Sequence, residues 1–243
     1  MKRERKSILI VTTGQISRNP RVGKEATALA TAGYDVTVLY VRNVPEYDRY
    51  DQELIRRSSF RTIALDHLSR DKPARRAANV DRFRTRLARY AARIGFASAD
   101  AFGPYRSLLN RAKAEPADLT IVHTETAFAV GRRLLAEGRR VAADFEDWHS
   151  RDLLPAARRN RPLRLLSELE RTMASRTCYA STTSLALGAA LAETYQAPVP
   201  VLVRNTFPRE RVSDDRPIGT PPTLFWFSQT IGPGRGLESF VTA

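Results

Sequence analysis

Two short apolar runs near the start of the chain constrain its fold more than any other feature. Residues 8–13 and 36–41 are rich in aliphatic and β-branched side chains, as in strands buried on both faces of a parallel sheet. Between them, Asn19 is placed to cap a helix that begins at Pro20, and Gly33 is placed to end it. A strand, a helix and a strand in so few residues predict a right-handed βαβ unit.

The alternation of strands and helices continues along most of the chain. Residues 43–59 are polar and predict a loop, whereas residues 81–114 predict a helix broken at Gly103 and Pro104. Further strands are expected at residues 60–65, 118–123, 140–146, 177–182 and 198–205, and further helices at residues 127–137, 162–175 and 184–195. This pattern predicts an α/β fold, a Rossmann-like parallel sheet flanked by helices.

The composition changes near the end of the chain. Residues 209–222 are rich in Asp, Pro and Gly, which is typical of a linker. The strand and helix expected after them cannot bury a core of their own. We therefore expect a Rossmann-like domain in residues 1–208, a linker in residues 209–222, and the first strand and helix of a truncated second domain in residues 223–243.

Charge and cysteine content limit the partners and the compartment. The formal net charge is +14, which favours anionic partners such as phosphates, nucleic acid or an acidic membrane surface. A solvated, arginine-rich surface is the alternative. Cys178 is the only cysteine, so no disulfide forms within the chain and a reducing, cytoplasmic compartment is indicated. No run approaches the about 18 apolar residues of a membrane-spanning helix.

Ligands of open α/β sheets bind beyond the carboxyl ends of the strands, and the first such position holds Gly14, Arg18 and Arg21. A helix N-terminus there offers free N–H groups and the positive end of a dipole to an anion. The glycine pattern of dinucleotide-binding loops and the lysine of a P-loop are both missing from this stretch. An ordinary capped helix is the alternative.

Two further strand ends carry polar side chains. His123 ends one expected strand and Glu125 opens the following helix, so we expect the ring of His123 to face a cleft; a satisfied structural histidine is the alternative. Asp144, Glu146 and Asp147 crowd the next strand end. Their spacing suits a divalent cation, but an acidic loop that neutralises nearby arginines is the interpretation we favour.

The last stretch of interest is "SQTIGPGRGLES". Gly234 and Gly236 free the backbone on either side of Arg235, just before an expected helix. A guanidinium group and free N–H groups in this arrangement are suited to a diphosphate.

Together these stretches resemble the GT-B glycosyltransferases, specifically the retaining family-4 type. The resembling segments are "GQISRNPRVGKEATALATAGYDVTVL", "DLTIVHTETAFAVGRRLL", "ADFEDWHSRDL", "VLVRNTFP" and "LFWFSQTIGPGRGLESF", and they occur in the family's order. The resemblance implies the N-terminal half of a GT-B fold. It also implies transfer of a sugar from a nucleotide-sugar donor to a hydroxyl of a polysaccharide, glycolipid or small-molecule acceptor, with no cofactor or metal.

The resemblance also assigns roles to residues. It implies that His123 contacts the transferred sugar, as the catalytic residue, and that Gly14 lies near the donor phosphates. It implies that the donor diphosphate is bound by Arg235, with Gln229 where a second basic residue is usual. From their own positions, Gly234 and Gly236 are candidates for the same diphosphate site. The candidates for the acceptor side or the cleft are Arg18, Arg21, Glu125, Asp144, Glu146 and Asp147. The family's later glutamate pair lies beyond this chain, so we expect the chain alone to be inactive.

Two other functions stay open. A metal-dependent glycosyltransferase of the other fold would use Asp144 and Glu146 as its metal motif. A basic α/β module that binds nucleic acid or another anion without catalysis would explain the charge, although no recognised nucleic-acid motif is present and we expect no nucleic-acid partner.

The helix expected from residue 81 has an apolar stripe, Phe83, Leu87, Tyr90 and Ile94, among five arginines. A basic amphipathic helix is suited to lie on an anionic bilayer, so we expect peripheral binding to the inner face of the membrane. The alternative is that the stripe packs on the sheet while the arginines face water.

Overall fold

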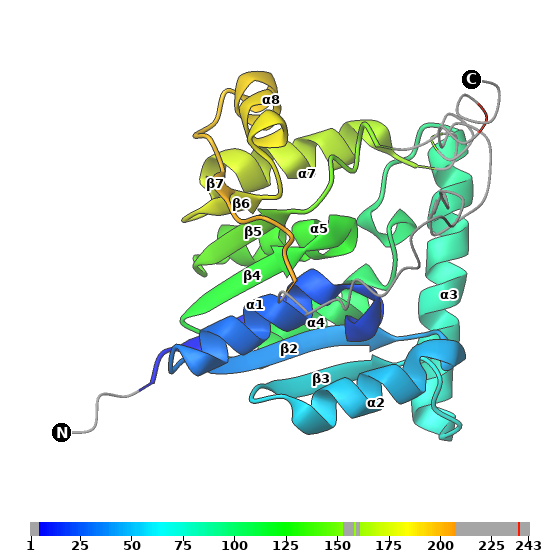
Figure 1. The fold of residues 1–243 in the computed structure, drawn as a ribbon. Coiled ribbons are helices and arrows are strands. Elements are labelled where there is room, and N and C mark those ends of the chain that lie inside the picture. Colours follow the sequence, from blue (N-terminus) through cyan, green and yellow to red (C-terminus); the bar gives the residue numbers. More distant parts are fainter. Residues whose placement is uncertain (1–4, 153–157, 159–160, 208–237, 239–243) are drawn as a thin grey trace, which may run out of the picture. The chain divides into compact units, whose positions relative to one another are not determined.

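The computed structural model describes residues 5–152, 158, 161–207 and 238. Its centre is one parallel sheet of seven strands in the order β3-β2-β1-β4-β5-β6-β7 (Figure 1). The strands are β1 (Ser7–Val11), β2 (Asp35–Arg42), β3 (Arg61–Asp66), β4 (Leu119–His123), β5 (Val141–Phe145), β6 (Ala180–Thr182) and β7 (Val201–Leu202). The predicted α/β fold with a Rossmann-like parallel sheet is confirmed.

Helices cover both faces of the sheet. They are α1 (Pro20–Thr31), α2 (Asp48–Arg57), α3 (Lys72–Arg93), α4 (Tyr105–Ala114), α5 (Thr124–Ala136), α7 (Leu163–Arg176) and α8 (Leu185–Tyr195). Side chains of α1 and α2 pack on one face of the central strands, and side chains of α4, α5, α7 and α8 pack on the other. Since both faces are covered, the central strands are mostly apolar, and their buried polar side chains include His123 and Asp144 near the carboxyl ends.

The first βαβ unit forms as the sequence predicts. The Asn19 side chain accepts a hydrogen bond from the backbone N–H of Val22, and Pro20 is the first residue of α1. Gly33 follows the helix with φ of +96°, a left-handed conformation that costs glycine little. Strand β2 then pairs in parallel with β1. Local sequence thus determines both ends of α1.

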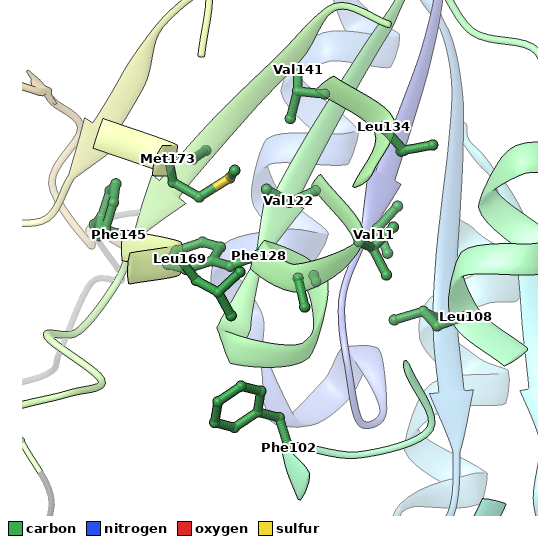
Figure 2. Packing of buried hydrophobic residues seen from close by; sticks show 14 of the residues in the cluster. Val11, Phe102, Leu108, Val122, Phe128, Leu134, Val141, Phe145, Leu169 and Met173 are labelled. Atoms are coloured by element: carbon green, nitrogen blue, oxygen red, sulfur yellow. The ribbon is translucent and has the colours of Figure 1, made fainter. Parts of the chain in front are cut away.

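Side chains of β1 alternate between two cores. Ile8 and Ile10 belong to the core under α1 and α2, whereas Leu9 and Val11 belong to the larger core on the opposite face. In that larger core the rings of Phe128 and Phe145 lie 5.0 Å apart between centroids, next to side chains of α7 (Figure 2).

Helix α5 lies very close to the sheet in that core. A Cβ added to Gly131 would lie 3.1 Å from both Met173 Sδ and Val122 Cγ2. Glycine therefore allows α5 to approach β4 and α7 more closely than a larger residue would. This close packing fixes α5, whose first residue, Thr124, directly follows the end of β4 at His123.

The structure corrects two local predictions. Residues 43–59 are not a loop, because they contain α2, whose Leu54 and Ile55 pack against the core under α1. Acidic residues in the first turn of α2 and arginines in its last turn complement the helix dipole and stabilise the helix. Because α2 has few apolar residues, its sequence resembles that of a polar loop, and the helix was not predicted. Helix α3 spans Lys72–Arg93 rather than beginning at residue 81, and the break before α4 extends over residues 94–104 instead of lying at Gly103 and Pro104 alone.

Contacts divide the chain into two units, Met1–Asn205 and Thr206–Ala243, and the sheet with its helices α1 to α8 belongs to the first. Apart from Glu238, the expected linker and second domain lie outside the described residues. Within the described part of the chain, no helix combines the length and apolar character needed to cross a bilayer.

Candidate functional site

The strand order places a switch point between β1 and β4. The chain leaves these neighbouring strands toward opposite faces of the sheet, and ligands of open α/β folds bind in the crevice this creates. Thr13 and Thr124, just beyond the two strands, are joined through their hydroxyl oxygens at 2.8 Å. Thr124 has φ of +73°, which is uncommon for a β-branched residue and locates backbone strain at this edge.

A cavity of about 480 Å³ opens beside this hydroxyl pair. Its wall comprises the loop after β1 with Gly14, residues that follow β2 and β3, one side of α3, and the loop before α4. Helix α3 stands across the carboxyl ends of β2 and β3 (Figure 1). Gly14 has φ of +82° and open space where a Cβ would be, so its backbone is accessible from the cavity.

A second group of polar side chains lies under the surface of the same edge. His123, at the end of β4, is fully buried. Its Nε2 lies 2.7 Å from Glu25 Oε2, and its Nδ1 lies 3.0 Å from Glu146 Oε1 and 3.3 Å from Asp144 Oδ2. The imidazole ring is therefore surrounded by carboxylates from α1, from β5 and from the residue that follows β5.

Arg21 supplies a second buried cation to this group, which we call the buried charge network. Its guanidinium donates two hydrogen bonds to the carboxylate of Asp144, at 2.5 and 2.6 Å. It donates a third, at 2.6 Å, to the backbone oxygen of Val203. Asp144 also accepts a hydrogen bond from the Ser181 hydroxyl at 2.5 Å, and Glu146 accepts one from the amide of Asn19 at 2.7 Å.

The network shifts the protonation of its members. Burial alone would lower the pKa of His123, but hydrogen bonds to Asp144, Glu146 and Glu25 hold that pKa well above 6.5. Burial alone would raise the pKa of Asp144, but hydrogen bonds from Arg21 and His123 hold it well below its ordinary value. The network thus favours the imidazolium form of His123 and the carboxylate form of Asp144.

These contacts correct our expectation for His123. The ring does not face an open cleft, because its side chain is inaccessible to solvent and both of its nitrogens have carboxylate partners. An imidazolium held in this way has no free lone pair with which to accept a proton from a substrate. His123 joins α1 to β4 and β5, and its role toward a sugar stays a prediction.

The acidic residues of the network could also be considered for a metal ion. Ligand atoms of His123, Asp144 and Glu146 lie within 4.8 Å of one another. Both oxygens of Asp144 accept hydrogen bonds from Arg21, however, so a metal ion would compete with that guanidinium for the carboxylate. The contact between Arg21 and Asp144 is of the kind expected from an acidic segment that neutralises a nearby arginine, and the absence of a metal stays a prediction.

The other predicted site residues are placed apart from the network. Arg18 is exposed and lies over the ring of Tyr47, 5.0 Å from its centroid, and Asp147 is exposed. Glu125 pairs with Arg161. The predicted donor residues Gln229, Gly234, Arg235 and Gly236 lie outside the described residues.

Sequence reasoning did not find several residues of this edge. Glu25 follows Arg21 by one helical turn, so their shared face on α1 was a usable signal. Arg82, Arg86 and Arg89 line the cavity, although we expected α3 to present its arginines to a membrane. Their spacing places them on one side of α3, but the sequence does not reveal which side faces the sheet.

No family model and no curated protein sequence matches the chain. Among solved structures, the chain is similar to LpCGTa in complex with UDP, with a TM-score of 0.53 and 12% identity over 84% of this chain and 54% of that one. Arabidopsis thaliana UGT89C1 with UDP-L-rhamnose gives a TM-score of 0.47 and 14% identity over 86% and 54%. A protein described as a UDP-N-acetylglucosamine 2-epimerase from Listeria monocytogenes gives 0.46 and 11% over 82% and 44%.

The superposition on LpCGTa shows the fold alone, a Rossmann-like domain of the GT-B type. The chain spans about half the length of this and the UGT89C1 structure. What the similar proteins bind is therefore a starting point for the proposal below.

The ion pair of Arg21 and Asp144 predicts non-additive mutations. Arg21→Met and Asp144→Leu should each lower the free energy of unfolding by about 3–5 kcal/mol, because each leaves a buried charge without its partner. The double variant should lose clearly less than the sum, as measured by urea unfolding. Removing the exposed pair Arg57 and Glu53 serves as the control and should cost about 1 kcal/mol at most. Additive losses at the buried pair would contradict the network.

The raised pKa of His123 predicts how stability depends on pH. Above about pH 6.5 the unfolded histidine is neutral while the folded one keeps its proton. Each further pH unit should therefore reduce the stability of the wild type by about 1.4 kcal/mol relative to His123→Gln, until the folded pKa is reached. Urea unfolding of both proteins from about pH 6 to about pH 9 measures this difference. A difference that does not change with pH would show that His123 is buried in its neutral form.

Proposed function

We propose that the chain is the acceptor-side domain of a glycosyltransferase that moves a sugar from a nucleotide-sugar donor to an acceptor hydroxyl. The observation that carries this proposal is the cavity beyond the carboxyl ends of β1, β2 and β3, beside the β1/β4 switch point of a seven-stranded parallel sheet. A substrate there can approach the backbone of Gly14, because no side chain covers it. The retaining, family-4-like mechanism belongs to the same proposal.

Two kinds of group would carry the chemistry in this proposal. Positioning of the acceptor hydroxyl in the cavity supplies proximity to the donor. Stabilisation of the leaving diphosphate falls to N–H groups near Gly14 and to Arg235 with Gly234 and Gly236, with Gln229 nearby in sequence. His123 acts as a positioning residue, since its contacts hold α1 against β4 and β5. LpCGTa was solved with UDP, so UDP-sugars are the first donors to test.

A pair of glycine variants tests the proposed site. Gly14 and Gly33 both have positive φ, +82° and +96°, and both have open space where a Cβ would be. Gly14→Ala and Gly33→Ala should therefore cost a similar stability, about 1–2 kcal/mol. Only Gly14→Ala should lower sugar transfer, since only Gly14 lines the cavity.

The assay for this pair follows nucleoside diphosphate release from UDP-sugars by the protein at its full natural length. We expect the transfer to survive chelation, since the proposed mechanism uses no metal. Equal activity of the two glycine variants would contradict the site, and loss of activity on chelation would favour a metal-dependent reaction.

We also propose that α3 contacts an anionic membrane surface. The stripe predicted from sequence is exposed rather than packed on the sheet: Phe83 is 67% exposed and Tyr90 is 64% exposed. The interpretation that the stripe is core is therefore wrong. An exposed apolar stripe on a chain of net charge +14 is complementary to an anionic bilayer.

Vesicle sedimentation tests this contact. The wild-type chain should sediment with phosphatidylcholine vesicles that contain phosphatidylserine, and much less with phosphatidylcholine alone. Phe83→Ser with Ile94→Ser should abolish the binding, because both side chains are exposed on the stripe. Leu185→Ser, at an equally exposed leucine on α8, should leave it unchanged. Indifference of the wild type to anionic vesicles at low salt would overturn the membrane contact.

A further inference from the structure

The arginines of α3 are distributed unevenly around the helix. Arg82, Arg86 and Arg89 line the cavity, and their spacing of four and three residues places them on one side of α3. Arg84, two residues from both Arg82 and Arg86, does not line it. One side of the helix thus presents three guanidinium groups to the carboxyl edge of the sheet.

These three cations have no carboxylate of their own among the described residues. The one acidic side chain that lines the cavity, Asp81, already accepts a hydrogen bond from Ser107 at 2.8 Å and lies 3.1 Å from His67 Nε2. No described residue forms an ion pair with Arg82, Arg86 or Arg89. The wall of the cavity therefore carries a net positive charge.

Hydrogen bonds to backbone oxygens orient two of the three arginines, whereas the guanidinium of the third is available to bind a ligand. Arg82 donates to the backbone oxygen of His67 at 2.7 Å, and Arg89 donates to that of Ala101 at 3.0 Å. Arg86 donates to no described residue. Burial and the nearby Arg161 cation lower the pKa of Arg89, although the Glu125 carboxylate acts in the opposite direction.

Three guanidinium groups around one cavity repel one another, and an anion between them removes that cost. A guanidinium group binds phosphate oxygens through two parallel hydrogen bonds, and neutral donors complete such sites. Thr85 and Asn43 line the same cavity and supply a hydroxyl and an amide. A volume of about 480 Å³ accommodates a phosphate together with the small molecule that carries it.

We propose that this cavity binds a phosphate group, with Arg86 as its main ligand and Arg82 and Arg89 on either side. That the phosphate belongs to the acceptor rests on the proposed glycosyltransferase function, whereas the phosphate site itself does not. Two kinds of molecule could supply this phosphate group. One is a soluble phosphorylated compound, and the other is a phospholipid whose headgroup reaches the cavity over the exposed stripe of α3.

Calorimetric titration of the chain with inorganic phosphate tests the site directly. Arg86→Gln should weaken the binding at least about tenfold, because it removes a charged hydrogen-bond donor. It should leave the melting temperature unchanged, since Arg86 donates to no described residue. Arg84→Gln is the matched control, with the same change of charge on the same helix, and should bind phosphate as the wild type does. Absence of saturable binding, or an equal loss in both variants, overturns the site.

Two further arms identify the source of the phosphate. A soluble source predicts that glycerol 3-phosphate binds the wild type and binds Arg86→Gln at least about tenfold more weakly. A lipid source predicts sedimentation with phosphatidylcholine vesicles containing phosphatidic acid that Arg86→Gln reduces and Arg84→Gln does not. Either result supports the phosphate site. Indifference of both probes to Arg86→Gln overturns it.

The test of the phosphate site can fail independently of the test of glycosyltransferase activity. Phosphate binding that depends on Arg86, in a full-length protein that transfers no sugar from any donor tested, would retain the site and contradict the glycosyltransferase proposal. Sugar transfer by a protein whose phosphate affinity does not depend on Arg86 would contradict the site alone.

Discussion

The ion pair between Arg21 and Asp144 is the contact on which the carboxyl edge of the sheet depends. It joins the first turn of α1 to the end of β5, and the third hydrogen bond of Arg21 reaches Val203, just beyond β7. His123 connects the end of β4 to the same contacts, because its ring lies between carboxylates from α1 and from the end of β5. Segments far apart in sequence are thus held together where strands end and ligands bind. Such buried charges stabilise only as a complete set, since removal of any one leaves its partner uncompensated.

The carboxyl edge of the sheet has two regions that differ in charge balance: in one the charges are paired, and in the other positive charge is in excess. In the buried charge network every cation has a carboxylate partner, and the side chains of His123 and Asp144 are closed to solvent. In the neighbouring cavity three arginines face one acidic side chain that is already engaged. The buried charge network is suited to hold the neighbouring strands and α1 in place, and the cavity is suited to bind an anion. Thr13 lines the cavity, and its hydroxyl contacts that of Thr124, which directly follows His123, so the network is linked to the backbone near Gly14 without lining the cavity itself.

The fold was predictable because its information is local. Asn19, Pro20 and Gly33 define α1, and buried strands read as apolar runs whatever their neighbours. The site was less predictable because its geometry depends on contacts between distant segments. His123 was found by its place at a strand end, but its burial depends on Glu25, which lies 98 residues earlier in the chain. The direction in which α3 presents its arginines likewise depends on how α3 packs against η3 (Ala99–Ala101) and the sheet edge, which periodicity alone does not show.

The protonation state of His123 tests the account most directly, because a closed network of ion pairs requires an imidazolium between these carboxylates. The chain has three histidines, so their ring nitrogen resonances are readily assigned by nitrogen-15 NMR with single His→Gln variants. The account predicts that both ring nitrogens of His123 carry protons at neutral pH and keep them well above pH 6.5. A neutral ring at pH 7, or a titration near the ordinary histidine value, would contradict it and would return His123 to the groups able to accept a proton from a substrate.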